Sequence, residues 1–203
     1  MLKYVEYINE AKKEVKYPFI QAATRGNNNK VKEFIKSGVD INMKDTDDKT
    51  ALMYAVKSNL LFVVNTLIDA GADPNIQDRE GRTALMMAST NKIFNKLLDA
   101  GADVNIKNIN GDNFLVVKLD YFGNLDDQKI RFFEKLVSKG LNIKNENKFG
   151  RSFYDILVGR SEHSNQFNPG LRHLLDFKKY IDEKFPEIKE GWDLKNDMVK
   201  YNL

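Results

Sequence analysis

The feature that most constrains this chain is a short phrase that recurs along it. The residues GADPNI at 71–76 return as GADVNI at 101–106, and a weaker copy, GVDINM, stands at 38–43. Self-similarity with a period of about 20–50 residues indicates a chain built from stacked units, each unable to bury its hydrophobic face alone. Such chains usually act through an extended surface, so a deep pocket is not the first expectation.

Each unit consists of a turn, two apolar segments and the glycine phrase. The two clearest units open with the letters TALM, which begin at Thr50 and Thr83. A threonine there can cap a helix, because its hydroxyl accepts from the free amides of the first turn. The apolar spacing predicts a short first helix in each unit, which in the second example extends through Ala88 and Ser89. A second helix ends at the repeated glycine, which can adopt the left-handed conformation that closes a helix.

These features together resemble the ankyrin repeat, in which two antiparallel helices are followed by a projecting loop. Weaker copies extend the frame in both directions, with AATRG at 22–26 and GRSFY at 150–154. The resemblance implies an all-α fold, a helical solenoid of about five helix-pair repeats. The expected parts are an N-terminal capping helix at 1–16, units at about 17–45, 46–78, 79–108, 109–146 and 147–181, and a C-terminal tail or cap at 182–203.

The opening of each unit departs from the family pattern. The family opening is Thr-Pro-Leu-His, whose histidine usually braces the turn, and here Met53 and Met86 take its place. We expect both methionines to hold the turn by packing instead. In the fourth unit Lys118 stands where a small alanine is usual, so its first helix is expected to tilt or to direct the amine outward.

The spacing of the units is uneven. The glycines at 38, 71, 101 and 140 are 33, 30 and 39 residues apart. Three residues are missing near 90–92 and about six are added near 123–128, between paired helices, where a connection can change length. The added segment at 121–128 either packs over a neighbouring unit or protrudes as a contact loop. The amphipathic 1–16 segment either caps the array or binds a partner, and the tail with Trp192 either packs back or is presented to a partner.

The sequence carries none of the motifs that we associate with catalysis or metal binding. It has no cysteine, and neither His163 nor His173 has a second ligand at metal spacing. No phosphate-binding glycine loop and no nucleophile elbow occurs. Acidic pairs such as Asp47-Asp48 fall in expected loops, where solvation keeps both carboxylates ionised. We therefore expect a protein that is not an enzyme and that uses no cofactor and no metal.

The charge and the hydropathy of the chain narrow the classes of partner. A formal net charge of +3, with lysines interspersed among acidic residues, gives no footprint for nucleic acid. No apolar run approaches the roughly 18–20 residues that cross a bilayer, and the first residues lack the apolar core of a secretory signal. We expect a monomer in the cytoplasm that contacts neither nucleic acid nor membrane.

In the ankyrin family, partners usually bind the loop tips and the solvent edge of the first helices. Carried over to this chain, that surface combines aromatic or aliphatic groups with arginines, the composition of interaction hot spots. The candidate partner-binding residues are Arg79, Arg82, Ile109, Asn110, Asp112, Tyr121, Lys148, Phe149 and Arg151.

Two functions remain open from the sequence. The first is a non-catalytic scaffold that binds another protein through the concave groove of loop tips and first helices. The second is a bacterial effector or inhibitor that acts on another protein by occlusion, which would require secretion. The identity of the partner is not legible in the residues.

Overall fold

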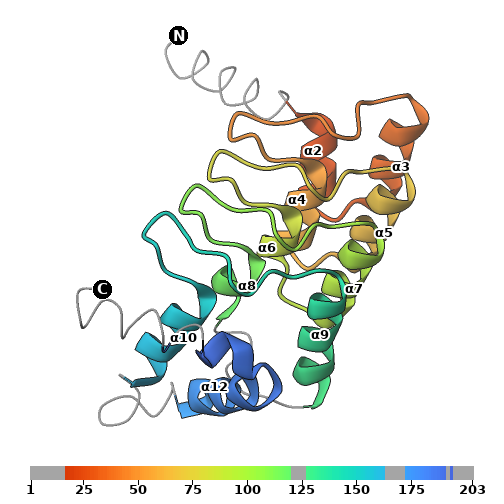
Figure 1. Cartoon of the computed structure of the whole chain (residues 1–203). Coiled ribbons are helices and arrows are strands. Elements are labelled where there is room, and N and C mark those ends of the chain that lie inside the picture. Colours follow the sequence, from red (N-terminus) through yellow and green to blue (C-terminus); the bar gives the residue numbers. More distant parts are fainter. Residues whose placement is uncertain (1–16, 120–126, 163–171, 191–192, 194–203) are drawn as a thin grey trace. The chain divides into compact units, whose positions relative to one another are not determined.

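The computed structural model describes residues 17–119, 127–162, 172–190 and 193, without the side chains of 159–162 and 172–175 (Figure 1). Throughout this part of the chain, every regular element is a helix, and a single isolated bridge joins Glu146 to Ser152. The all-α expectation is therefore confirmed. The capping helix expected at 1–16, Tyr121 and Trp192 lie outside the described residues.

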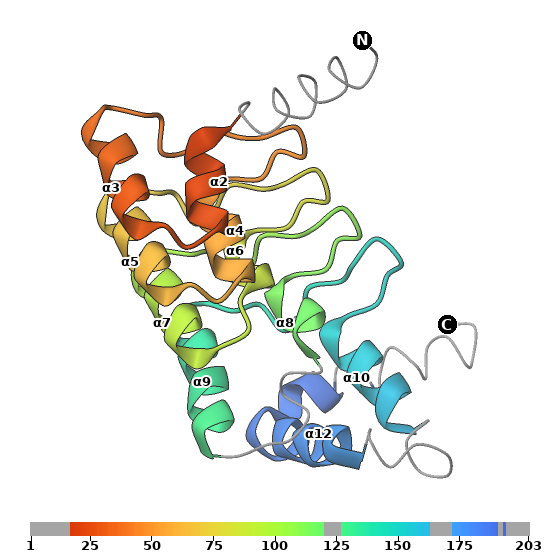
Figure 2. The same cartoon turned by 180° about the vertical axis from the view of Figure 1, so that it is seen from behind.

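The chain divides into two compact units, residues 1–103 and 104–203. In the first unit, α2, α4 and α6 pack side by side in one row, and α3, α5 and α7 form a second row (Figures 1 and 2). Each helix of the first row is paired with the helix that follows it in the sequence. The bounds are α2 Pro18–Thr24, α3 Asn28–Lys36, α4 Ala51–Lys57, α5 Leu61–Asp69, α6 Ala84–Met87 and α7 Asn91–Asp99.

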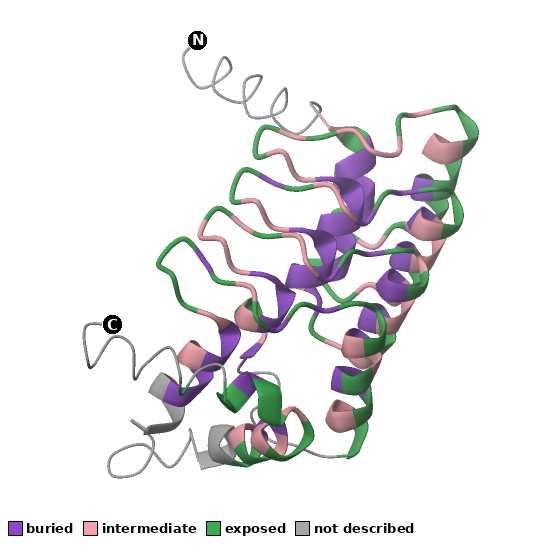
Figure 3. Ribbon diagram, viewed as in Figure 1, coloured by how far each residue is buried: buried purple, intermediate pink, exposed green. Residues whose placement is uncertain are grey.

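The core of the first unit lies on the facing sides of these two rows (Figure 3). Leu52 and Val56 of α4, Val64 and Leu67 of α5 and Phe94 of α7 are almost completely buried. Met53 and Met86 are buried as well, which agrees with the expectation that they hold their turns by packing. Burial of this kind is the main favourable contribution to folding.

The helix starts follow the expected caps only in part. Thr50 precedes α4, and its Oγ1 accepts from the amide of Met53 at 3.4 Å. Thr83 precedes α6 in the same extended conformation but makes no side-chain cap bond.

The expected helical face through Ala88 and Ser89 is wrong, because α6 ends at Met87. Ala88 is extended, with φ −62° and ψ 148°. The repeat that contains α6 and α7 has a short link between these two helices, so the chain must stretch in order to reach the start of α7 at Asn91. Thr90 in this link donates from Oγ1 to Oδ1 of Asn59 at 3.0 Å.

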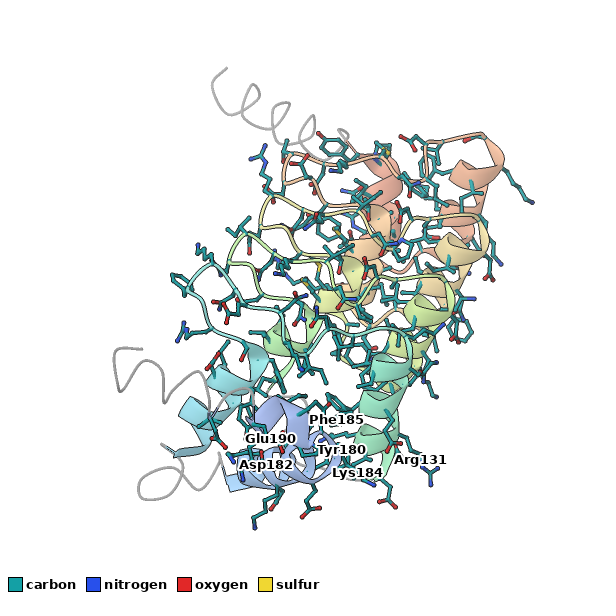
Figure 4. All side chains as sticks on the ribbon, viewed as in Figure 1. Arg131, Tyr180, Asp182, Lys184, Phe185 and Glu190 are labelled. Atoms are coloured by element: carbon teal, nitrogen blue, oxygen red, sulfur yellow. The ribbon has the colours of Figure 1, made fainter. Side chains whose placement is uncertain are left out.

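The second unit contains α8 Phe114–Val117, α9 Asp127–Ser138, α10 Phe153–Glu162 and α12 Arg172–Lys184. α10 packs against α8 and α12. The ring of Phe133 on α9 lies 5.3 Å from Phe177, 6.1 Å from Tyr180 and 5.8 Å from Phe185, measured between centroids. Tyr180 and Phe185 are labelled in Figure 4. An aromatic cluster thus joins α9 to α12 and to the residue that follows it.

Two expectations for the second unit can be compared with the structure, the boundary at 181 and the direction of the Lys118 amine. The boundary expected at 181 falls inside α12, which continues to Lys184, and Ile188 beyond it is buried. Lys118 lies directly after α8, and burial lowers the pKa of its amine. The amine is thus partly withdrawn from water, which contradicts the expectation that the fourth repeat directs it outward.

Asparagine side chains connect successive repeats at the glycine phrase. In the first unit, Asn75 donates to the carbonyl of Gly101 at 3.0 Å and accepts from the amide of Asp103 at 2.7 Å. In the second unit, Asn105 donates to the carbonyl of Gly140 at 2.8 Å and accepts from the amide of Asn142 at 2.8 Å. The same contacts made twice explain why the phrase recurs with its asparagine intact.

Candidate functional site: the loop tips

Four five-residue loop tips precede first helices: tip 1 (45–49), tip 2 (78–82), tip 3 (108–112) and tip 4 (147–151). In every tip the amide of the first residue donates to the carbonyl of the fifth. The four distances are Asp45 to Lys49 3.0 Å, Asp78 to Arg82 3.0 Å, Asn108 to Asp112 2.9 Å and Asn147 to Arg151 2.9 Å. The tips therefore share one backbone frame, and they differ in the side chains that they carry.

In the first unit, tip 2 is tied to tip 1. The amide of Arg79 donates to the carbonyl of Asp47 at 3.1 Å, and the Arg79 guanidinium lies 3.9 Å from the carboxylate of Asp48. This predicted partner-binding residue already has a role within the chain.

Arg82 is held more firmly than Arg79. Its Nε and Nη2 donate to the buried carboxylate of Asp78 at 3.0 and 2.8 Å, and its Nη1 lies 2.7 Å from Glu80. A two-pronged contact of this kind fixes the position of a guanidinium. The structural role of Arg82 was missed from the sequence, although the spacing Asp-x-Glu-x-Arg within a tight turn was a usable signal.

In the second unit, tip 4 is tied to tip 3. The amide of Lys148 donates to the carbonyl of Asn110 at 3.0 Å, and Nδ2 of Asn147 donates to the carboxylate of Asp112 at 2.9 Å. A Cβ on Gly111, which has φ +78°, would come within 2.7 Å of the Lys148 amide nitrogen. Asn110 and Asp112, both predicted to bind a partner, thus hold the two tips together.

Each of these two tips carries one large apolar side chain that is exposed. Ile109 on tip 3 is 62% exposed and Phe149 on tip 4 is 61% exposed. The Lys148 ammonium lies 5.2 Å and the Arg151 guanidinium 5.5 Å from the centre of the Phe149 ring. Of the nine predicted residues, six come together on the joined tips 3 and 4: Ile109, Asn110, Asp112, Lys148, Phe149 and Arg151.

A half-buried polar pair that the sequence analysis did not identify joins tip 1 to α4. Asp45 accepts from the Tyr54 hydroxyl at 2.7 Å. Partial burial opposes ionisation of Asp45, but hydrogen bonds from Tyr54 and from the amides of Lys49 and Asp47 outweigh it and lower its pKa. Burial and the bond to Asp45 raise the pKa of Tyr54 to about 12. This pair stabilises the turn, because both groups are engaged with each other.

The described residues also bear on two other kinds of feature, a metal site and a membrane-spanning helix. No cluster of three or more metal-binding side chains occurs among the described residues. No described helix is both long enough and apolar enough to span a membrane. Neither histidine has a described side chain, so both remain outside this comparison.

The helices pair in two rows, and the loop tips share one backbone frame but carry different side chains. This arrangement defines the class of helical-repeat proteins. Residues 19–108 match the family model described as ankyrin repeats (3 copies), so this part of the chain consists of ankyrin repeats. The resemblance stated from the sequence is confirmed over that span. No curated protein matches the chain. Ankyrin repeats generally mediate contacts between proteins and are generally not enzymes.

Proposed function

We propose that the chain is a non-catalytic interaction scaffold that binds another protein through the joined tips 3 and 4. The observation that carries this proposal is the pair of large apolar side chains, Ile109 and Phe149, exposed on two loops that are hydrogen-bonded to each other. Exposed apolar groups with neighbouring cations are the composition of binding hot spots.

The fixed geometry of the two tips supports this placement. Binding normally costs free energy for ordering the loops that make contact. The bonds from Lys148 to Asn110 and from Asn147 to Asp112 have already ordered these loops in the unbound chain. An arriving partner therefore meets a surface that requires little rearrangement.

Tips 1 and 2 are weaker candidates for the primary contact. The cation of tip 1, Lys49, lies 3.2 Å from Asp47. In tip 2, Arg79 lies beside Asp48, and Arg82 is bound by Asp78 and Glu80. We propose that Arg79 contributes at the rim, that Arg82 keeps its turn in shape, and that the chain acts as a cytoplasmic monomer. Occlusion of another protein's site would use the same surface, and no observation favours it over simple scaffolding.

Replacement of both Ile109 and Phe149 by alanine tests this function. A partner recovered by affinity capture with the unaltered chain would be purified, and its dissociation constant measured for each variant. We expect the double variant to bind at least about tenfold more weakly, because two hot-spot side chains are removed.

Phe62→Ala provides the matched control for this experiment. Phe62 is 82% exposed on α5 and lies on no loop tip, so its loss removes a similar exposed ring at another place. The control variant should retain the affinity of the unaltered chain. Undiminished binding by the double variant, with its helical content intact, would contradict the placement on tips 3 and 4.

A further inference from the structure

Tips 2 and 4 have the same backbone frame, but the arginine of tip 2 forms ion pairs within its tip and the arginine of tip 4 does not. Position for position, Asp78, Arg79, Glu80, Gly81 and Arg82 of tip 2 correspond to Asn147, Lys148, Phe149, Gly150 and Arg151 of tip 4. Both tips therefore keep basic residues at the second and the fifth place. The two acidic residues of tip 2 are replaced in tip 4 by a neutral amide and an aromatic ring.

The replaced residues are those that bind the arginine in tip 2. Arg82 pairs with Asp78 at 2.8 Å and with Glu80 at 2.7 Å. Arg151 has neither partner, because Asn147 and Phe149 stand in their places. Over the described part of the chain, no carboxylate forms an ion pair with Lys148 or Arg151, and both residues are exposed.

Asp112 does not compensate this charge by direct contact. It is the only carboxylate in tips 3 and 4, and it accepts from the amide nitrogen of Asn147 at 2.9 Å. The guanidinium of Arg151 is instead placed over the ring of Phe149, as is the ammonium of Lys148. Tip 4 thus presents an exposed ring with two cations over it, and no carboxylate of the described residues forms an ion pair with either cation.

We propose that tip 4 recognises a protein segment in which carboxylates flank an apolar side chain. The apolar side chain would contact Phe149 and Ile109, and the carboxylates would pair with Lys148 and Arg151. This inference rests on the proposed function and adds the chemistry of the partner to it. Charge complementarity carries it, since a guanidinium without an internal partner binds a planar carboxylate well.

The probe for this proposal is a fluorescently labelled nonapeptide with a central leucine flanked on each side by two glutamates. The comparison peptide has glutamine at the four glutamate positions. Fluorescence anisotropy with the full chain, at peptide and chain concentrations up to about 1 mM, measures both affinities. We expect the glutamate peptide to bind about threefold to tenfold more tightly, a difference that two exposed ion pairs can supply together.

Three variants locate this selectivity. Arg151→Gln should remove most of the preference for the glutamate peptide. Phe149→Glu should remove it as well, because it restores at tip 4 the acidic residue that pairs with Arg82 at tip 2. Lys139→Gln, which removes an exposed cation of the same unit away from the tips, should leave the preference unchanged.

Each other outcome overturns the proposal in a distinguishable way. Equal binding of both peptides, lost on replacing Ile109 and Phe149 by alanine, would refute carboxylate recognition and leave the binding surface in place. Failure of both peptides to bind would also refute it. Competition by duplex DNA as strong as by the glutamate peptide would assign the cations to phosphate instead. Failure of the proposed function would be seen in the capture experiment instead. There, the captured partner would bind the double alanine variant of Ile109 and Phe149 as tightly as it binds the unaltered chain.

Discussion

One polar side chain closes each loop tip. The first residue of every tip accepts from the amides of the third and the fifth residue. The distances are 2.8 and 2.9 Å for Asp45, 3.0 and 2.9 Å for Asp78, 2.8 and 3.0 Å for Asn108, and 3.0 and 3.2 Å for Asn147. Aspartate and asparagine serve equally because each offers the same side-chain oxygen to its own backbone. The identity of this residue is thus free to set the charge of the tip.

Asp45 separates these two contributions, the amide bonds and the charge. Asp45→Ala removes every hydrogen bond to the side chain, and we expect it to reduce the free energy of unfolding by about 1–3 kcal/mol. Asp45→Asn keeps an acceptor for both amides, as at Asn108, so its loss should be smaller. Urea unfolding of the two variants at pH 7 measures the difference, and equal losses would contradict this account.

The pH dependence of the asparagine variant follows from the lowered pKa of Asp45. A carboxyl whose pKa is lowered by folding adds stability above its ordinary pKa of 3.8, and this stability is lost as the pH falls through the folded value. The stability gap between the unaltered chain and Asp45→Asn should therefore narrow from pH 7 to pH 3. A gap that widens on acidification would show that the charge of Asp45 is not stabilised in the fold.

At the scale of elements, the backbones of tips 3 and 4 are in direct contact, and the amide of Lys148 donates to the carbonyl of Asn110 at 3.0 Å. Gly111 and Gly150 occupy the same place in their tips, and both have positive φ, +78° and +67°. A Cβ on Gly111 would meet the amide of Lys148, whereas one on Gly150 would meet nothing within 4 Å. The two glycines share a conformational requirement and differ in steric surroundings.

Gly111→Ala and Gly150→Ala form a matched pair for this contact. Both substitutions incur the strain of a left-handed alanine, about 1–2 kcal/mol. Gly111→Ala should cost about 1–3 kcal/mol more, because the tips must separate to accommodate the methyl group. Thermal or urea unfolding compares the two. Equal losses would indicate that the tips are not held together at this position.

At the scale of the whole molecule, the first unit is a set of helix pairs that support one another. α5 packs against both α3 and α7, and Leu67 on its inner side is fully buried. In an array of this kind, stability is approximately a sum of terms for each repeat and each interface. A change in the middle helix therefore affects both neighbours.

Leu67→Ala should reduce the free energy of unfolding by about 2–5 kcal/mol, the range for a buried leucine. Amide exchange should accelerate in α3 and α7 as well as in α5. Phe62→Ala, on the same helix and exposed, should change stability by less than about 0.5 kcal/mol. Unchanged exchange in α3 and α7 would show that Leu67 does not contribute to the interfaces between pairs.

The sequence was sufficient for the parts of the fold that repeat. Gly71 and Gly101, with their asparagines, marked the ends of second helices, and Thr50 marked the start of a first helix as a cap. The end of α6 at Met87 was not predictable from apolar spacing, because it depends on how far the chain must stretch to reach Asn91. Local periodicity carries no information about that distance.

The candidate site was predictable as a set of residues but not as a set of roles. Ile109 and Phe149 were found because the repeat frame places them at loop tips, where an apolar group near a cation has the composition of a binding hot spot. The engagement of Arg82 by Asp78, and the freedom of Arg151 from such a contact, depend on which side chains reach one another in a tight turn. Tyr121 lies outside the described residues, so its role stays a prediction.

The asparagine bridges between repeats imply a rule for how this chain tolerates change in length. Asn75 spans to Gly101 and Asp103 within the first unit, and Asn105 spans to Gly140 and Asn142 within the second. The spacing between successive repeat glycines is 30 residues in one case and 39 in the other. The pair of asparagine hydrogen bonds is nevertheless the same. Alignment from one repeat to the next is thus set at the glycine phrase, which leaves the connections inside a repeat open to insertion and deletion. New binding loops could be grafted there without disturbing the register of their neighbours.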